Sequence, residues 1–111
     1  MKLAVVLATI LMAISNLAVA VDRTPIGDVE RGTMVTVVGE VERILDTDEF
    51  RLRDESGSIR VYVGPNWVPA AIGESVTVAG FVDDGIGRLE LYARTLTRAD
   101  GTIVQFEYDY D

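Results

Sequence analysis

Cysteine and histidine are both absent from this sequence of 111 residues, and its one lysine is Lys2. Without cysteine the chain forms no disulfide bond, so a hydrophobic core alone must stabilise the fold. The two absences also exclude Ser-His and Cys-His nucleophile pairs and the ordinary zinc sites. Carboxylate pairs remain, but such pairs arise by chance among 18 acidic residues. We therefore expect a binding protein rather than an enzyme, with no cofactor and no metal site.

The first twenty residues have the composition of a secretory signal peptide. Met1-Lys2 is a basic start, residues 3–14 are apolar except for Thr9, and residues 18–20 read Ala-Val-Ala. The apolar run is shorter than the roughly 20 residues that a membrane-spanning helix needs. We expect cleavage after Ala20 and export of residues 21–111 to the periplasm as one domain, with no stable membrane insertion. An uncleaved anchor is the alternative.

Most of the remaining sequence has the pattern of β-strands. Valine and threonine alternate with polar residues, and glycine and aspartate separate the runs, which predicts strands at 33–45, 49–54, 58–63, 74–82, 88–97 and 102–107. Asp100-Gly101 is a strong two-residue hairpin turn before the last strand. Residues 67–72 predict a short helical turn, although Pro69 limits it. Thr24-Pro25 predicts another helical turn through Glu30.

An internal repeat helps to define the architecture. Residues 32–41 and 73–82 share the pattern G-x-x-V-T-V-x-G-x-V, in which Gly39 and Gly80 fall inside strands. A glycine there indicates a bulge or a sharp bend. Five short, bent strands in this order predict an all-β, five-stranded OB-fold Greek-key barrel over about 32–97, with an extra hairpin strand and tail at 98–111. An immunoglobulin-like sandwich would need about seven strands.

Three segments of the chain resemble one bacterial family. They are residues 35–41 (VTVVGEV), 49–63 (EFRLRDESGSIRVYV) and 76–83 (VTVAGFVD), and the more particular features are the turn from Asp54 to Gly57 and the single Trp67. The pattern is similar to that of the periplasmic OB-fold (BOF) family, the YgiW/YdeI-type stress-tolerance proteins. The resemblance implies a small periplasmic binding domain linked to envelope stress response, with no known enzymatic activity.

The hairpin at 50–64 has two unlike faces. Apolar side chains alternate on one face, and the other face bears the ligand-binding candidates Arg51, Arg53, Arg60 and Tyr62. On an OB barrel this outer face of the second and third strands is where ligands bind, so the arginines are candidates for an anionic ligand. The alternative is ion pairing with Glu40 and Glu42 of the first strand, which would leave Arg60 as the arginine with the least evident partner.

Aspartates occupy two loops that flank this face: Asp46, Asp48, Asp83 and Asp84. A calcium loop of the EF-hand type needs a glutamate at its twelfth position, and counting from Asp46 that position is Gly57. Turn formation explains these aspartates without a metal. A polyamine or a basic peptide is an alternative ligand for them.

We predict an exported, non-enzymatic protein that binds a small charged ligand or peptide on the face of the second and third strands. The alternative is an assembly module that contacts an envelope protein through a strand edge or through the outward side chains Phe81 and Tyr92. An oligonucleotide is the third possibility, but loss of Lys2 changes the net charge from −8 to −9, which opposes nucleic-acid binding. Trp67 is predicted to plug one end of the barrel.

Overall fold

The computed structural model describes residues 22–107, so the predicted signal peptide and the last residues of the tail lie outside the described part. The elements are η1 (Ile26–Asp28), β1 (Met34–Asp46), β2 (Glu49–Asp54), β3 (Gly57–Tyr62), β4 (Ser75–Val82), β5 (Glu90–Thr97) and β6 (Ile103–Gln105). Each predicted strand is present, and its ends differ from the prediction by at most two residues. Within this part of the chain, no helix is long and apolar enough to cross a membrane.

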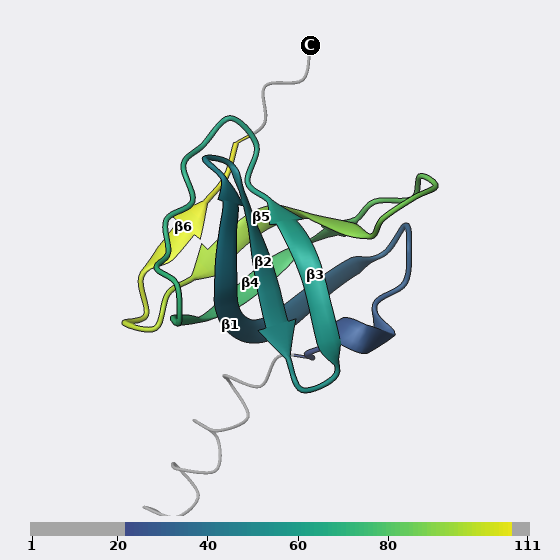
Figure 1. The fold of residues 1–111 in the computed structure, drawn as a ribbon, viewed down its shortest axis with the longest axis horizontal. Coiled ribbons are helices and arrows are strands. Elements are labelled where there is room, and N and C mark those ends of the chain that lie inside the picture. Colours follow the sequence, from purple (N-terminus) through teal and green to yellow (C-terminus); the bar gives the residue numbers. More distant parts are fainter. Residues whose placement is uncertain (1–21, 108–111) are drawn as a thin grey trace, which may run out of the picture.

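The strands form the closed barrel that the sequence predicts. Their order is β3-β2-β1-β4-β5, and a parallel pairing of β3 with β5 closes the ring. β1 is long and strongly curved, since its first half pairs with β4 and its second half pairs with β2 (Figure 1). β6 continues the sheet beyond the barrel by pairing with the end of β5. This is an all-β OB-type fold with one additional strand.

The barrel interior is filled by alternate residues of the five strands. The side chains with no more than 4% exposure in these strands are Val37, Val41, Phe50, Leu52, Ile59, Val61, Val76, Val78, Val82, Leu91, Ala93 and Leu96. The apolar face predicted for the β2–β3 hairpin is therefore the buried one, and its arginines face outward.

The two repeat glycines lie where the backbones of neighbouring strands approach closely. A Cβ atom at Gly39 would lie 2.6 Å from the carbonyl oxygen of Arg53. One at Gly80 would lie 2.9 Å from the carbonyl carbon of Tyr92. The β4–β5 ladder shifts register between Ala79 and Gly80, so this glycine marks a β-bulge.

The helical turn predicted at 67–72 is wrong, because residues 63–74 contain no helix. Pro69 has no N–H group and disfavours a helical conformation at Val68. The backbone instead bonds to β1 and to the turn after it, with the Val68 N–H donating to the Thr47 carbonyl and the Gly73 N–H to the Val41 carbonyl. The segment therefore crosses over the β1–β2 turn as an irregular connection with bends and a turn (Figure 1).

Trp67 does not plug the barrel, because its side chain is 78% exposed. Trp67 lies in this irregular connection and faces away from the core. The buried cluster is completed by Ile26 and Val29 from the N-terminal segment, by Val63 after β3 and by Phe106 after β6.

Candidate functional site

Three arginines are successive cross-strand partners on the outer face of the barrel. Arg43 of β1 pairs with Arg51 of β2, and Arg51 pairs with Arg60 of β3. We call Arg43, Arg51 and Arg60 the arginine row. The row continues across the parallel β3–β5 pairing to Glu90, which lies opposite Arg60. Like charges placed directly opposite one another in a sheet are destabilising, so this arrangement needs an explanation.

A groove of about 180 Å³ lies beside two members of the arginine row, Arg51 and Arg60. It is lined from β2 and β3 and from the β4–β5 loop (residues 83–89) by Arg51, Ser58, Ile59, Arg60, Arg88 and Leu89. Within residues 22–107, Arg43, Arg51 and Arg88 form no ion pair. The structure thus brings two of the predicted arginines together and adds Arg88, which the sequence prediction missed. The order of an OB barrel places the start of the fifth strand beside the third, and that signal could have identified it.

Arg31 fixes the loop that bears Arg88. Its Nη1 donates to the carbonyl oxygen of Gly85 at 2.6 Å, and its Nη2 donates to that of Gly87. Gly87 has a φ of 108°, a conformation that favours glycine. The β4–β5 loop is therefore tied to the segment before β1, which holds Arg88 at the groove.

Arg60 has a partner that the sequence prediction did not consider. Its Nη1 donates to Glu49 Oε1 at 2.6 Å, and the two side chains are 28% and 17% exposed. The Nε atom of Arg60 is buried and has no hydrogen-bond partner among the described residues. Leaving a buried donor unsatisfied costs about 1–3 kcal/mol. Glu49 thus accepts from the Nη1 donor of Arg60, and the Nε donor of Arg60 has no acceptor among the described residues.

Glu90 is the second carboxyl group at Arg60. Burial and the neighbouring carboxylates of Glu49 and Asp83 together raise the pKa of Glu90 to about 6, although Arg60 acts to lower it. Arg60 therefore lies between Glu49, with which it forms an ion pair, and Glu90, its register partner on β5.

The other predicted hairpin residues lie outside the groove. Arg53 Nε is 3.6 Å from Glu42 Oε2, which confirms the ion pair expected for Glu42. Both side chains are exposed, and such pairs contribute up to about 1 kcal/mol. Tyr62 lies opposite Tyr92 across the β3–β5 pairing, with the two rings edge to face and their centroids 6.0 Å apart.

The loop aspartates make turns. Asp46 Oδ1 accepts from the Thr47 N–H, and Asp83 Oδ1 accepts from the Gly85 N–H. No group of three acidic side chains in residues 22–107 could hold a metal ion. The structure does not gather Asp46, Asp48, Asp83 and Asp84 into one site.

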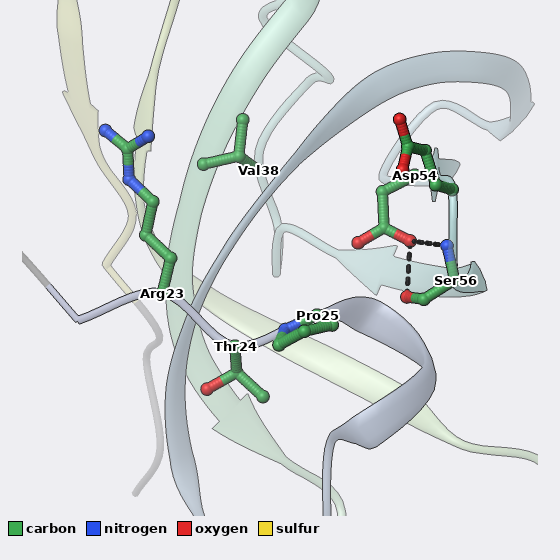
Figure 2. Close-up of a pocket in the computed structure, with 7 residues that line it drawn as sticks. Arg23, Thr24, Pro25, Val38, Asp54 and Ser56 are labelled. Atoms are coloured by element: carbon green, nitrogen blue, oxygen red, sulfur yellow. Dashed lines mark hydrogen bonds between the residues drawn. The ribbon is translucent and has the colours of Figure 1, made fainter.

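A larger hollow of about 430 Å³ lies between residues 23–25, Val38 of β1 and the β2–β3 turn (Figure 2). Asp54 lies in its wall, where one carboxylate oxygen accepts from the Ile26 N–H and the other from the Ser56 and Gly57 N–H groups. Burial is the largest single influence and raises the pKa of Asp54, but the hydrogen bonds together hold it below its ordinary value. Arg23 points away from Asp54 (Figure 2). Since the carboxylate is already saturated by backbone donors, this hollow is a structural junction.

Comparison with known proteins supports the fold. No family model matches the sequence, and no curated protein matches it. The structure of the hypothetical protein YgiW from E. coli is similar, with a TM-score of 0.60 and 20% identity over 71% of this chain and 91% of that chain. The telomere capping protein Ten1 from Saccharomyces pombe has a TM-score of 0.49 and 22% identity over 68% of this chain and 74% of that chain. The YgiW-type OB fold that the sequence resemblance implied is confirmed.

Proposed function

We propose that this protein is a non-enzymatic OB-fold binding protein that holds a small anionic ligand at the groove between β2, β3 and the β4–β5 loop. The arginine row is the observation that supports this proposal. Eighteen acidic residues are available in the chain, yet Arg43, Arg51 and Arg88 have no ion-pair partner within residues 22–107. An anion in the groove would relieve the repulsion between the guanidinium groups.

Guanidinium chemistry defines the class of ligand. The planar fork of an arginine donates two parallel hydrogen bonds to a carboxylate, sulfate or phosphate group. A groove of about 180 Å³ is smaller than the usual pocket for a whole drug-sized ligand, so it fits the anionic group of a small molecule or a short acidic peptide. The net charge of −8 disfavours a long polyanion such as nucleic acid.

A titration with sulfate tests the proposal. In the wild-type protein, added sulfate should produce saturable NMR shifts at the Nε–Hε signals of Arg51, Arg60 and Arg88. Because charge-assisted hydrogen bonds contribute about 1.5–3 kcal/mol, the double variant Arg51→Ala/Arg88→Ala should weaken binding by about tenfold or more. Arg53→Ala is the matched control, since Arg53 lies on the same hairpin but outside the groove. No saturable shift, or an equal loss in the control, would refute the proposal.

Export to the periplasm and a role in envelope stress belong to the same proposal. The composition of residues 1–20 and the family resemblance support them. Expression of the full chain in a Gram-negative bacterium should yield a periplasmic protein whose mass corresponds to residues 21–111. Retention of the uncleaved chain in the cytoplasm would contradict export without affecting the anion site.

An assembly role is the alternative. Phe81 is the cross-strand partner of both Met34 and Tyr92, and Met34 is 62% exposed, so apolar side chains adjoin on the outer face of β1, β4 and β5. This alternative predicts a stoichiometric complex with an envelope protein that Met34→Asp abolishes. The Arg51→Ala/Arg88→Ala variant should retain that complex.

A further inference from the structure

We propose that Glu90 regulates anion binding at the groove: its protonation removes a negative charge from beside Arg60, so the site binds anions more tightly at mildly acidic than at neutral pH. The inference rests on the proposed function and assigns a regulatory role to a residue that does not line the groove itself. Its basis is the position of Arg60 between two carboxyl groups, Glu49 on β2 and Glu90 on β5.

The geometry places Glu90 next to a guanidinium group that an anion in the groove would use. Glu90 is the register partner of Arg60, and Arg60 also lines the groove. Arg60 Nη1 is committed to Glu49 at 2.6 Å, whereas its buried Nε has no hydrogen-bond partner among the described residues. An ionised Glu90 repels an incoming anion and neutralises the guanidinium that would bind it. A neutral Glu90 does neither.

The charged and titratable groups around Glu90 come from three neighbouring parts of the fold and from β5 itself. β4 contributes none, because its sequence SVTVAGFV contains no titratable side chain. The groups contributed by β2, β3, the β4–β5 loop and β5 are Glu49, Arg51, Arg60, Tyr62, Asp83, Arg88 and Tyr92. The Asp83 N–H also donates to the Glu90 carbonyl at 2.9 Å, which holds this acidic residue beside Glu90. The carboxylates of Glu49 and Asp83 thus raise the pKa of Glu90, and Arg60 acts to lower it.

The direction of the pH effect follows from this environment. Burial and the neighbouring carboxylates raise the pKa of Glu90 to about 6, so Glu90 is mostly neutral at pH 5 and mostly ionised at pH 7.5. An anion held by Arg60 would stabilise the neutral form of Glu90 further. Binding near pH 6 to 7 should therefore take up protons.

Sulfate is the suitable probe, because it stays a dianion from pH 5 to pH 7.5, whereas phosphate changes its charge. Removal of one negative charge within the site should tighten sulfate binding by about threefold or more between pH 7.5 and pH 5. Glu90→Gln should bind sulfate at pH 7.5 as tightly as the wild type does at pH 5, with little further change on acidification. Glu42→Gln is the control, since Glu42 pairs with Arg53 outside the groove and should leave the pH dependence intact.

The outcomes separate the two proposals. Sulfate binding with the same pH dependence in Glu90→Gln as in the wild type overturns the regulatory role and leaves the anion site standing. Failure of the wild type to bind sulfate at both pH values overturns both. A second measurement needs no variant: the carboxyl ¹³C signal of Glu90 should titrate at a higher pH when sulfate is present. An unchanged midpoint in saturating sulfate also overturns the inference.

Discussion

Gly80 lies at the point where β4 and β5 approach most closely around the bulge. A Cβ atom there would lie 2.9 Å from the carbonyl carbon of Tyr92 and 3.0 Å from the Cα of Ala93. Both are backbone atoms, which cannot move aside as the end of a flexible side chain can. The φ of Gly80 lies outside the left-handed region. The close approach of β5, and not the backbone conformation, therefore requires a glycine here.

Replacing Gly80 with alanine should destabilise the barrel. The added methyl group must push β5 away from β4, and overpacking of this kind costs about 1–3 kcal/mol in the free energy of unfolding. Gly57→Ala is the control, because a Cβ there meets atoms only at 3.6 Å and beyond. It should change the free energy of unfolding by less than about 0.5 kcal/mol. Urea denaturation of the two variants measures both values, and equal losses would contradict the argument.

Arg60 illustrates what sequence reasoning could and could not provide for a single residue. Strict alternation in the β2–β3 hairpin places its side chain on the outer face, and the structure confirms this placement. The sequence prediction looked for partners only on the first strand and left Arg60 without one. Its partner Glu49 is on β2, diagonally across the hairpin. Alternation fixes the face of a side chain, whereas ion pairing depends on the register and on side-chain reach.

The N-terminal segment and the β2–β3 turn are joined as one element by Asp54. Its carboxylate accepts hydrogen bonds from the Ile26 N–H at 2.9 Å and from the Ser56 N–H at 2.7 Å. The Ser56 hydroxyl in turn accepts from the Gly27 N–H at 2.7 Å. Gly27 fits closely, because a Cβ there would lie 2.6 Å from the Ser56 carbonyl oxygen. The turn from Asp54 to Gly57, singled out by the family resemblance, thus has a structural role.

Asp54→Ala should therefore loosen η1 selectively. Loss of the charged acceptor leaves the Ile26 N–H without its partner and should lower the free energy of unfolding by about 1–2 kcal/mol. Amide hydrogen exchange should accelerate at Ile26 and Gly27 while that of Val78 in the barrel changes only with global stability. Glu55→Gln, at the exposed neighbouring position, should leave the exchange at Ile26 unchanged. Unchanged exchange at Ile26 in Asp54→Ala would contradict the assigned role.

Elements with a regular pattern were predictable, and the irregular connection was not. The six strands alternate apolar and polar residues, so local sequence defines them. Residues 63–74 have no such period, and backbone hydrogen bonds join them to Val41 of β1 and to Thr47 of the β1–β2 turn. The conformation of this segment and the exposure of Trp67 depend on contacts distant in the sequence, which local propensity does not encode.

At the scale of the whole molecule, closure of the barrel creates the candidate site. Arg51 and Arg60 meet within one hairpin, so their proximity follows from the sequence pattern alone. Arg88 and Glu90 reach Arg60 only through the parallel pairing of β3 with β5. Half of the site therefore depends on a long-range contact. The resemblance to a family implied the fold, but no motif in the sequence marked these two residues.

The same distribution of charge sets the pH dependence of global stability. Hydrogen bonds from Arg98 hold the pKa of Glu74 at about 2, below its ordinary value of 4.5. The stability that ionised Glu74 contributes to the folded state is therefore lost as the pH falls below about 4.5. Glu90 acts in the opposite sense. Its folded-state pKa of about 6 exceeds the ordinary 4.5, so stability is gained as the pH falls from above 6 towards 4.5. The protein should be most stable between these two limits.

Urea denaturation between pH 3 and pH 8 should thus give a free energy of unfolding that is larger at pH 5.5 than at pH 7.5 and falls steeply below about pH 4. Glu90→Gln should remove the decline between pH 5.5 and pH 7.5, because glutamine cannot ionise. Glu74→Gln should reduce the stability at pH 5.5 and flatten the acid limb, since it breaks the paired hydrogen bonds with Arg98. The decline in stability at acidic pH is thus assigned to Glu74, and the decline towards neutral pH is assigned to Glu90. A neutral decline that persists in Glu90→Gln would show that overall charge repulsion, and not this carboxyl group, determines it.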